Sequence, residues 1–193
     1  MNRRKAIQQT AYLLGGAVSA SVMAGVMSGC QAEKQINWQP QFLNKDEAIL
    51  VGELAETILP ETDTLGAKSL GVPEYIDIVV KDCFTLKDQQ AFRDGLAKMN
   101  AAANSLLGQS FVDSSPEERQ TFLEGTEKAA FAERQKTGKK AFIITLKELV
   151  LTGYFTTEYA ITELMDYRPV PGIYEGCVEE PQKIQVGIEG RSA

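Results

Sequence analysis

The chain has 193 residues, 44% of them hydrophobic and 24% charged, which suits one globular domain with a core of ordinary size. Its formal net charge of −6 argues against nucleic acid or an anionic membrane surface as a general partner. Because the sequence contains no histidine, the usual Ser-His-Asp and Cys-His catalytic systems, most zinc sites and histidine-ligated haem are excluded.

Residues 1–29 have the pattern of an export signal. Three basic residues lie near the start, and no charged residue occurs from 6 to 29. A basic start, a moderately apolar stretch and small residues at its end are typical of a secretory signal. The adjacent Arg3 and Arg4 resemble the twin-arginine signal, which exports folded proteins, although the residues beside them depart from that pattern. Ordinary Sec export stays the alternative.

The stretch 27–30 resembles a bacterial lipobox, in which the cysteine becomes the lipidated first residue of the mature protein. Ser28 and Gly29 give the small side chains that a signal peptidase requires. Cys30 is therefore predicted to be lipidated, which would make the protein a membrane-tethered lipoprotein of the periplasm. Plain cleavage after a small residue, an uncleaved anchor and a buried first helix are the alternatives. Gln31 does not match the Asp that retains many lipoproteins at the inner membrane.

The chain behind this signal is acidic. Removal of residues 1–29 takes away three of the 20 basic residues and none of the 26 acidic ones, which leaves a net charge of −9. A lipid and an acidic body predict a tethered domain that is held off an anionic surface. Residues 30–43 are polar and are predicted to form a linker to a domain over 44–193. Trp38 within the linker would dock either on the domain or on a partner.

Helix signals recur from Asn44 onward and predict an all-α fold of about six helices around one core, with an irregular C-terminal tail. Helix starts are predicted at three capping patterns, which are Asn44 with Glu47, Thr85 with Asp88, and Ser115 with Glu118. Pro60 and Gly108 are predicted stops, and Pro73 suits a first helical turn.

Three further segments complete the prediction of secondary structure. The run 141–155 is the most apolar part of the mature chain and is predicted to be the central helix. A last short helix is expected over 157–165, and 183–188 has the pattern of a short strand.

Cysteines and carboxylates are the candidate chemistry of the domain. Cys83 and Cys177 remain after Cys30, and in an exported protein such a pair predicts a disulfide, with two separate thiols as the alternative. The carboxylates around the loop after the first helix could do acid–base work or bind calcium; they are Glu61, Asp63, Glu74 and Asp77. Because their spacing does not match a calcium loop, ordinary turn and cap roles are preferred.

Aromatic residues gather late in the chain, at Tyr154, Phe155, Tyr159, Tyr167 and Tyr174. They would form either a patch that faces a partner or part of the core, and the core is the more common role.

The stretch 53–77, ELAETILPETDTLGAKSLGVPEYID, resembles the signature of the gluconate 2-dehydrogenase subunit 3 family. The matching positions are Ile58, Leu59, Pro60, Thr62, Asp63, Thr64, Gly66, Ala67, Val72, Ile76 and Asp77. Leu65 stands where the family often has Pro. The later stretch 151–177 is similar to the C-terminal part of a Bacteroidetes branch of the same family.

This resemblance implies an accessory role. Members are small, non-flavin subunits of membrane-associated sugar and sugar-acid dehydrogenases, which oxidise CH–OH groups. A large subunit of the GMC type holds FAD, and a cytochrome c subunit is a further candidate partner. The small subunit often carries the export signal and helps the large one to mature and stay stable. We therefore expect no catalytic residue, metal or cofactor in this chain.

Two other functions stay open on the sequence alone. One is a stand-alone envelope lipoprotein that binds a protein or a glycan. The other is a carboxylate-based enzyme that uses Glu61 and Asp63.

Overall fold

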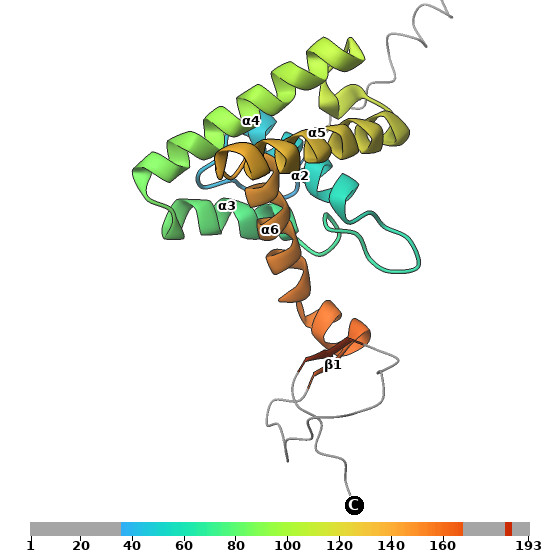
Figure 1. The fold of residues 1–193 in the computed structure, drawn as a ribbon. Coiled ribbons are helices and arrows are strands. Elements are labelled where there is room, and N and C mark those ends of the chain that lie inside the picture. Colours follow the sequence, from blue (N-terminus) through green and yellow to red (C-terminus); the bar gives the residue numbers. More distant parts are fainter. Residues whose placement is uncertain (1–35, 168–183, 187–193) are drawn as a thin grey trace, which may run out of the picture. The chain divides into compact units, whose positions relative to one another are not determined.

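The computed structural model describes residues 36–167 and 184–186, all within the unit that begins at Ile36. This part of the chain is helical apart from one pair of three-residue strands, which confirms the predicted all-α class (Figure 1). The α-helices are α2 (Lys45–Ile58), α3 (Val72–Cys83), α4 (Leu86–Leu107), α5 (Pro116–Thr137) and α6 (Phe142–Phe155). The shorter elements are the 3₁₀ helix η1 (Phe111–Asp113), the π-helix η2 (Ala160–Leu164), β1 (Met165–Tyr167) and β2 (Ile184–Val186).

Helix starts follow the capping patterns of the sequence. The Asn44 side chain accepts the Glu47 amide at 2.8 Å, and the Glu47 carboxylate accepts the Asn44 amide at 2.9 Å. The start of α5 has the same reciprocal capping box. At α4, Thr85 accepts the Asp88 amide and donates its hydroxyl to the Asp88 carboxylate. The predicted N-termini are therefore confirmed.

Helix ends are also determined locally. Gly108 and Gly138 end α4 and α5 in the left-handed region, with φ of 72° and 70°. A residue with a Cβ atom would be strained in this backbone conformation. Helix α2 ends at Ile58, two residues before Pro60, and Pro73 lies in the first turn of α3.

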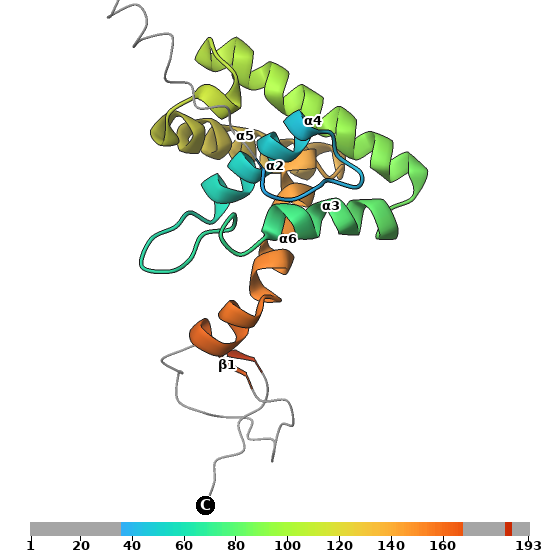
Figure 2. The same cartoon turned by 180° about the vertical axis from the view of Figure 1, so that it is seen from behind.

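The core is organised around two helices, α2 and α6, each of which packs against the other four α-helices (Figures 1 and 2). Leu54 of α2 and Leu146 of α6 are both completely buried. Helix α6 is therefore central, as predicted, but α2 is equally central. No helix within the described ranges is long and apolar enough to span a bilayer.

The last described elements form a small parallel pair. Strand β1 pairs with β2 in the register Met165 to Ile184 and Tyr167 to Val186. The predicted strand near the C-terminus is thus found, and the predicted last helix is present as the π-helix η2. The predicted irregular tail comprises residues 167–182; its first residue, Tyr167, belongs to β1, and residues 168–182 lie outside the described residues.

Residues 36–43 belong to the folded domain. Ile36, Trp38 and Phe42 pack against the core, and Leu43 is buried. The chain therefore docks Trp38 on its own domain, which answers the question that the sequence left open. The folded unit begins at Ile36, so residues 36–43 of the predicted linker belong to the domain, and residues 30–35 lie outside the described ranges.

Asp77 of α3 holds this segment in place. Its side chain is completely buried and accepts the backbone amides of Gln41 at 2.7 Å and Leu43 at 2.7 Å. The amide of Phe42 donates to the same carboxylate at 3.1 Å. Three backbone donors thus satisfy a buried carboxylate, which gives Asp77 a structural role in place of the acid–base role considered above.

We predict that Asp77→Ala lowers the free energy of unfolding by about 3 kcal/mol, because it leaves three amides without their acceptor. Urea denaturation followed by the fluorescence of Trp38, the only tryptophan, measures this change. The matched control is Asp82→Ala on the same helix, where the side chain is 60% exposed, and it should change stability by less than about 0.5 kcal/mol. Equal losses in the two variants would contradict the role of Asp77.

Candidate functional site

The loop between α2 and α3, residues 59–71, contains most of the family-like motif and is here called the signature loop. Its motif residues divide by exposure. Pro60, Thr62 and Asp63 are exposed, whereas Gly66 and Ala67 are buried and Thr64 is half-buried. The loop thus has an outer half that faces solvent and an inner half that packs on the domain.

Backbone hydrogen bonds close the loop. The Ala67 amide donates to the Leu59 carbonyl at 2.9 Å, which joins the two arms at the base. The Thr62 amide donates to the Thr64 carbonyl at 3.0 Å, which forms the outer turn. Ala67 is completely buried, so a larger side chain there would displace the arm from the core.

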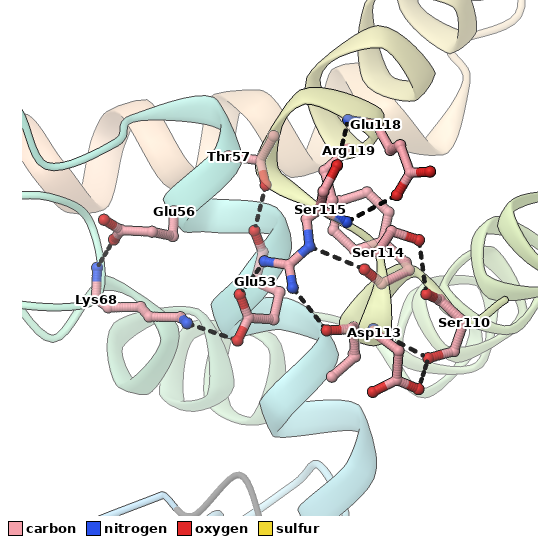
Figure 3. Close-up of polar contacts among 12 residues, drawn as sticks. Glu53, Glu56, Thr57, Lys68, Ser110, Asp113, Ser114, Ser115, Glu118 and Arg119 are labelled. Atoms are coloured by element: carbon pink, nitrogen blue, oxygen red, sulfur yellow. Dashed lines mark hydrogen bonds and ion pairs between the residues drawn. The ribbon is translucent and has the colours of Figure 1, made fainter. Parts of the chain in front are cut away.

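The carboxylate of Glu56 bridges the two arms from the end of α2. It accepts the Glu61 amide at 3.0 Å. It also accepts the Lys68 amide at 2.8 Å (Figure 3). Gly66 lies directly against this bridge. A Cβ atom on Gly66 would collide with the Glu56 carboxylate and lie 2.7 Å from the Glu61 nitrogen. Glycine is therefore required here by close approach, whereas its φ is not in the left-handed region.

Two tyrosines from the C-terminal part hold the outer half of the loop. The buried Tyr154 hydroxyl donates to the Leu65 carbonyl at 2.8 Å, and the Leu65 amide donates to the Tyr159 hydroxyl at 3.4 Å. The two sequence stretches that resemble the family thus meet in the fold, although 89 residues separate Leu65 from Tyr154.

Among the late aromatic residues, Tyr154, Phe155 and Tyr159 therefore serve the domain itself. The ring of Tyr154 is buried and packs edge-on against Phe155, with 5.3 Å between ring centroids. This is the core role that the sequence favoured. The side chains of Tyr167 and Tyr174 lie outside the described part of the structure.

A buried ion cluster lies behind the loop. Glu53 of α2 is 8% exposed, accepts Lys68 Nζ at 2.7 Å and pairs with Arg119 of α5 (Figure 3). Arg119 also donates to the carbonyls of Phe111 at 2.9 Å and Val112 at 2.6 Å. One guanidinium thus joins α2, η1 and α5, and the loop is attached through Lys68.

The four carboxylates predicted around this loop do not form a metal site. Glu61 accepts the Ser69 hydroxyl at 3.1 Å, and Asp63 and Glu74 are exposed. The Asp77 carboxylate already accepts backbone amides. Among the residues that the structure describes, no group of three or more Cys, Asp or Glu side chains is placed to hold a metal ion.

The remaining predicted site residues are only partly covered by the structure. Cys83 is exposed in the last turn of α3, and Cys177 lies outside the described ranges, so their disulfide stays a prediction. Arg3, Arg4 and Cys30 also lie outside the described ranges.

The sequence did not single out Glu53 and Glu56 of α2 or Arg119 of α5, which hold the loop and the elements behind it. Glu53 has a detectable signal, because it falls on the apolar stripe of α2 between Leu50 and Leu54. A carboxylate in such a position indicates a buried cationic partner. The identity of that partner, Arg119, has no signal in the local sequence.

We predict that Gly66→Ala lowers the free energy of unfolding by about 2 kcal/mol, since the added methyl displaces Glu56 from two amides. The matched control is Gly125→Ala within α5, where a Cβ has no atom within 4 Å. That exposed helical site should gain about 0.5–1 kcal/mol, because alanine restricts the unfolded chain more than glycine. Urea denaturation measures both, and a neutral Gly66→Ala would contradict the crowded geometry of the loop.

Comparison with known proteins adds one match. A family model described as Gluconate 2-dehydrogenase subunit 3 covers residues 45–172, which include the signature loop and both tyrosines that hold it. No curated protein and no solved structure matches the chain. Since the model covers well over half of the 193 residues, the chain belongs to the gluconate 2-dehydrogenase subunit 3 family.

Proposed function

We propose that this chain is the non-catalytic small subunit of a periplasmic FAD-dependent dehydrogenase that oxidises CH–OH groups of gluconate, another sugar acid, a sugar or a polyol. The observation that carries the proposal is the family match over residues 45–172. In this proposal FAD belongs to a GMC-type large subunit, and a cytochrome c subunit is a further partner.

The hydrogen bonds and ion pairs of the acidic side chains support a non-catalytic role. Asp77 accepts three backbone amides, Glu56 accepts two, and Glu53 pairs with both Arg119 and Lys68. Carboxylates engaged in this way maintain the fold and are poor proton shuttles, because proton transfer would break the contacts they make. With no histidine in the sequence, the chemistry is assigned to the partner.

The signature loop is the surface that we assign to the flavin subunit. Its outer half presents Leu65, which is 39% exposed, beside the exposed Thr62 and Asp63. The backbone of Leu65 is fixed on both sides by tyrosine hydroxyls. A loop that is ordered before binding loses little conformational entropy when a partner covers it, so its exposed leucine can contribute most of its burial energy.

The N-terminal residues give this subunit its role in export and tethering. A twin-arginine signal at Arg3 and Arg4 would carry the folded chain together with a bound, FAD-loaded partner. A lipid on Cys30 would then hold the complex at the membrane. Export, maturation and tethering of the flavin subunit thus follow from one signal on one chain.

The test is purification of the tagged, full-length chain from detergent-solubilised membranes of its native host. We expect a flavoprotein to co-purify, with the absorption spectrum of bound FAD. Leu65→Glu should lower its recovery at least about tenfold, because a charge is placed in an apolar contact. Leu106→Glu on α4 is the control, since Leu106 is 74% exposed and outside the loop. A chain that purifies alone at native abundance would contradict the proposal.

The export arm of the same experiment uses the double variant Arg3→Lys with Arg4→Lys, which keeps the charge but removes the twin-arginine pair. The flavoprotein should then disappear from the envelope fraction together with the chain. An envelope flavoprotein at its normal level would refute the export role while leaving the subunit role intact.

A further inference from the structure

Charge is distributed unevenly along the domain. Residues 128–140, here called the basic tip, contain five of the 20 basic residues and one of the 26 acidic ones, a net charge of +4. Residues 36–127 contain seven basic and 16 acidic residues, a net charge of −9. The total for the chain therefore conceals a local concentration of positive charge.

The basic tip is exposed. It comprises the last turns of α5 and the connection to α6, and every residue from 131 to 140 is exposed. Lys140 pairs with Glu148 in the middle of α6. Within the described part of the chain, Lys128, Arg134, Lys136 and Lys139 have no carboxylate at ion-pair distance. Their charges are available to an external anion.

An aromatic side chain lies among these cations. Phe131 is 47% exposed, with Lys128 one helical turn before it and Arg134 one turn after it. An exposed aromatic ring flanked by long basic side chains suits the bilayer interface, where the ring enters the headgroup region and the cations contact phosphates.

The chain length limits how far this domain lies from a lipid on Cys30. Six residues lead from Cys30 to Ile36, which span at most about 20 Å. Within the domain, residues 36–43 and the first residue of α6, which lies two residues beyond the basic tip, contact the same turn of α4. The guanidinium of Arg93 stacks on Phe42 at 4.5 Å, and the ring of Phe92 packs on Phe142 at 5.2 Å.

We propose that the basic tip binds the anionic headgroups of the bilayer, as a second contact beside the lipid on Cys30. The tethering lipid belongs to the proposed function, whereas the charge and exposure of the tip do not depend on it. Since the rest of the body is acidic, an anionic surface attracts the tip and repels the remainder, which orients the domain. A lipid with a basic patch also gives the two signals that stable anchoring requires.

The same orientation leaves the signature loop available to the flavin subunit. Helix α6 begins directly after the basic tip and ends at the tyrosines that hold the loop. Its 14 residues separate the two ends by about 20 Å. The membrane contact and the partner contact thus lie at opposite ends of α6.

The test is co-sedimentation of the full-length Cys30→Ala chain with vesicles of phosphatidylcholine, with and without phosphatidylglycerol. We expect binding to the anionic vesicles that weakens as salt rises. The double variant Lys136→Gln with Lys139→Gln should bind them about 30-fold more weakly, since each such lysine contributes about five-fold. The matched control, Lys87→Gln with Lys98→Gln, loses the same charge from exposed sites on α4 and should change binding less than about twofold.

Equal losses in the two double variants would overturn the proposal, because net charge alone would then explain binding. A tip variant that keeps its vesicle binding but no longer recovers the flavoprotein would also overturn it, in favour of a protein-binding tip. Absence of any flavoprotein partner would contradict the proposed function and leave the vesicle result unaffected, so the two failures are distinguishable. The export signal is identical in all variants and cancels in the comparison.

Discussion

The pairing of Glu53 with Arg119 is the interaction on which the rest of the domain depends. A carboxylate that is 8% exposed requires cationic partners, because an uncompensated buried charge costs several kcal/mol. Arg119 supplies one partner from α5 and Lys68 supplies another from the signature loop. Arg119 also donates hydrogen bonds to two backbone carbonyls of η1. A single acidic residue thus fixes where α2, η1, α5 and the loop lie relative to one another.

The signature loop follows from this arrangement. Glu56 lies one turn after Glu53 on the same helix and holds both arms of the loop from outside the core. Tyr154 of α6 fixes the outer half through the Leu65 carbonyl. Glu56 and Tyr154 both position the backbone of the loop, so the loop is ordered before any partner binds.

The local parts of the fold could be predicted from sequence. The Asn44–Glu47 box, Pro73 and Gly108 act within one helical turn, and each is found where the pattern placed it. The family motif likewise coincides with one structural unit, the signature loop. These features are readable because the residues that cause them are neighbours in the chain.

The long-range contacts could not be predicted. Residues 36–43 were included in the predicted linker although four of the eight are large apolar residues, and they are ordered by Asp77, which lies 34 residues beyond Leu43. Glu53 and Arg119 are 66 residues apart. The composition of a segment does not identify a distant donor or acceptor that pairs with it. For this reason the predicted linker extended into residues 36–43, which belong to the domain.

The central claim is that the signature loop is ordered in the free chain and meets the flavin subunit. Amide hydrogen exchange, measured on the chain alone and on the complex with its co-purified flavoprotein, tests both halves. In the free chain we expect the amides of Ala67 and Lys68 to be protected already. In the complex, residues 61–66 should gain protection while the basic tip stays unchanged. An unprotected loop in the free chain, or protection gained on another face alone, would contradict the claim.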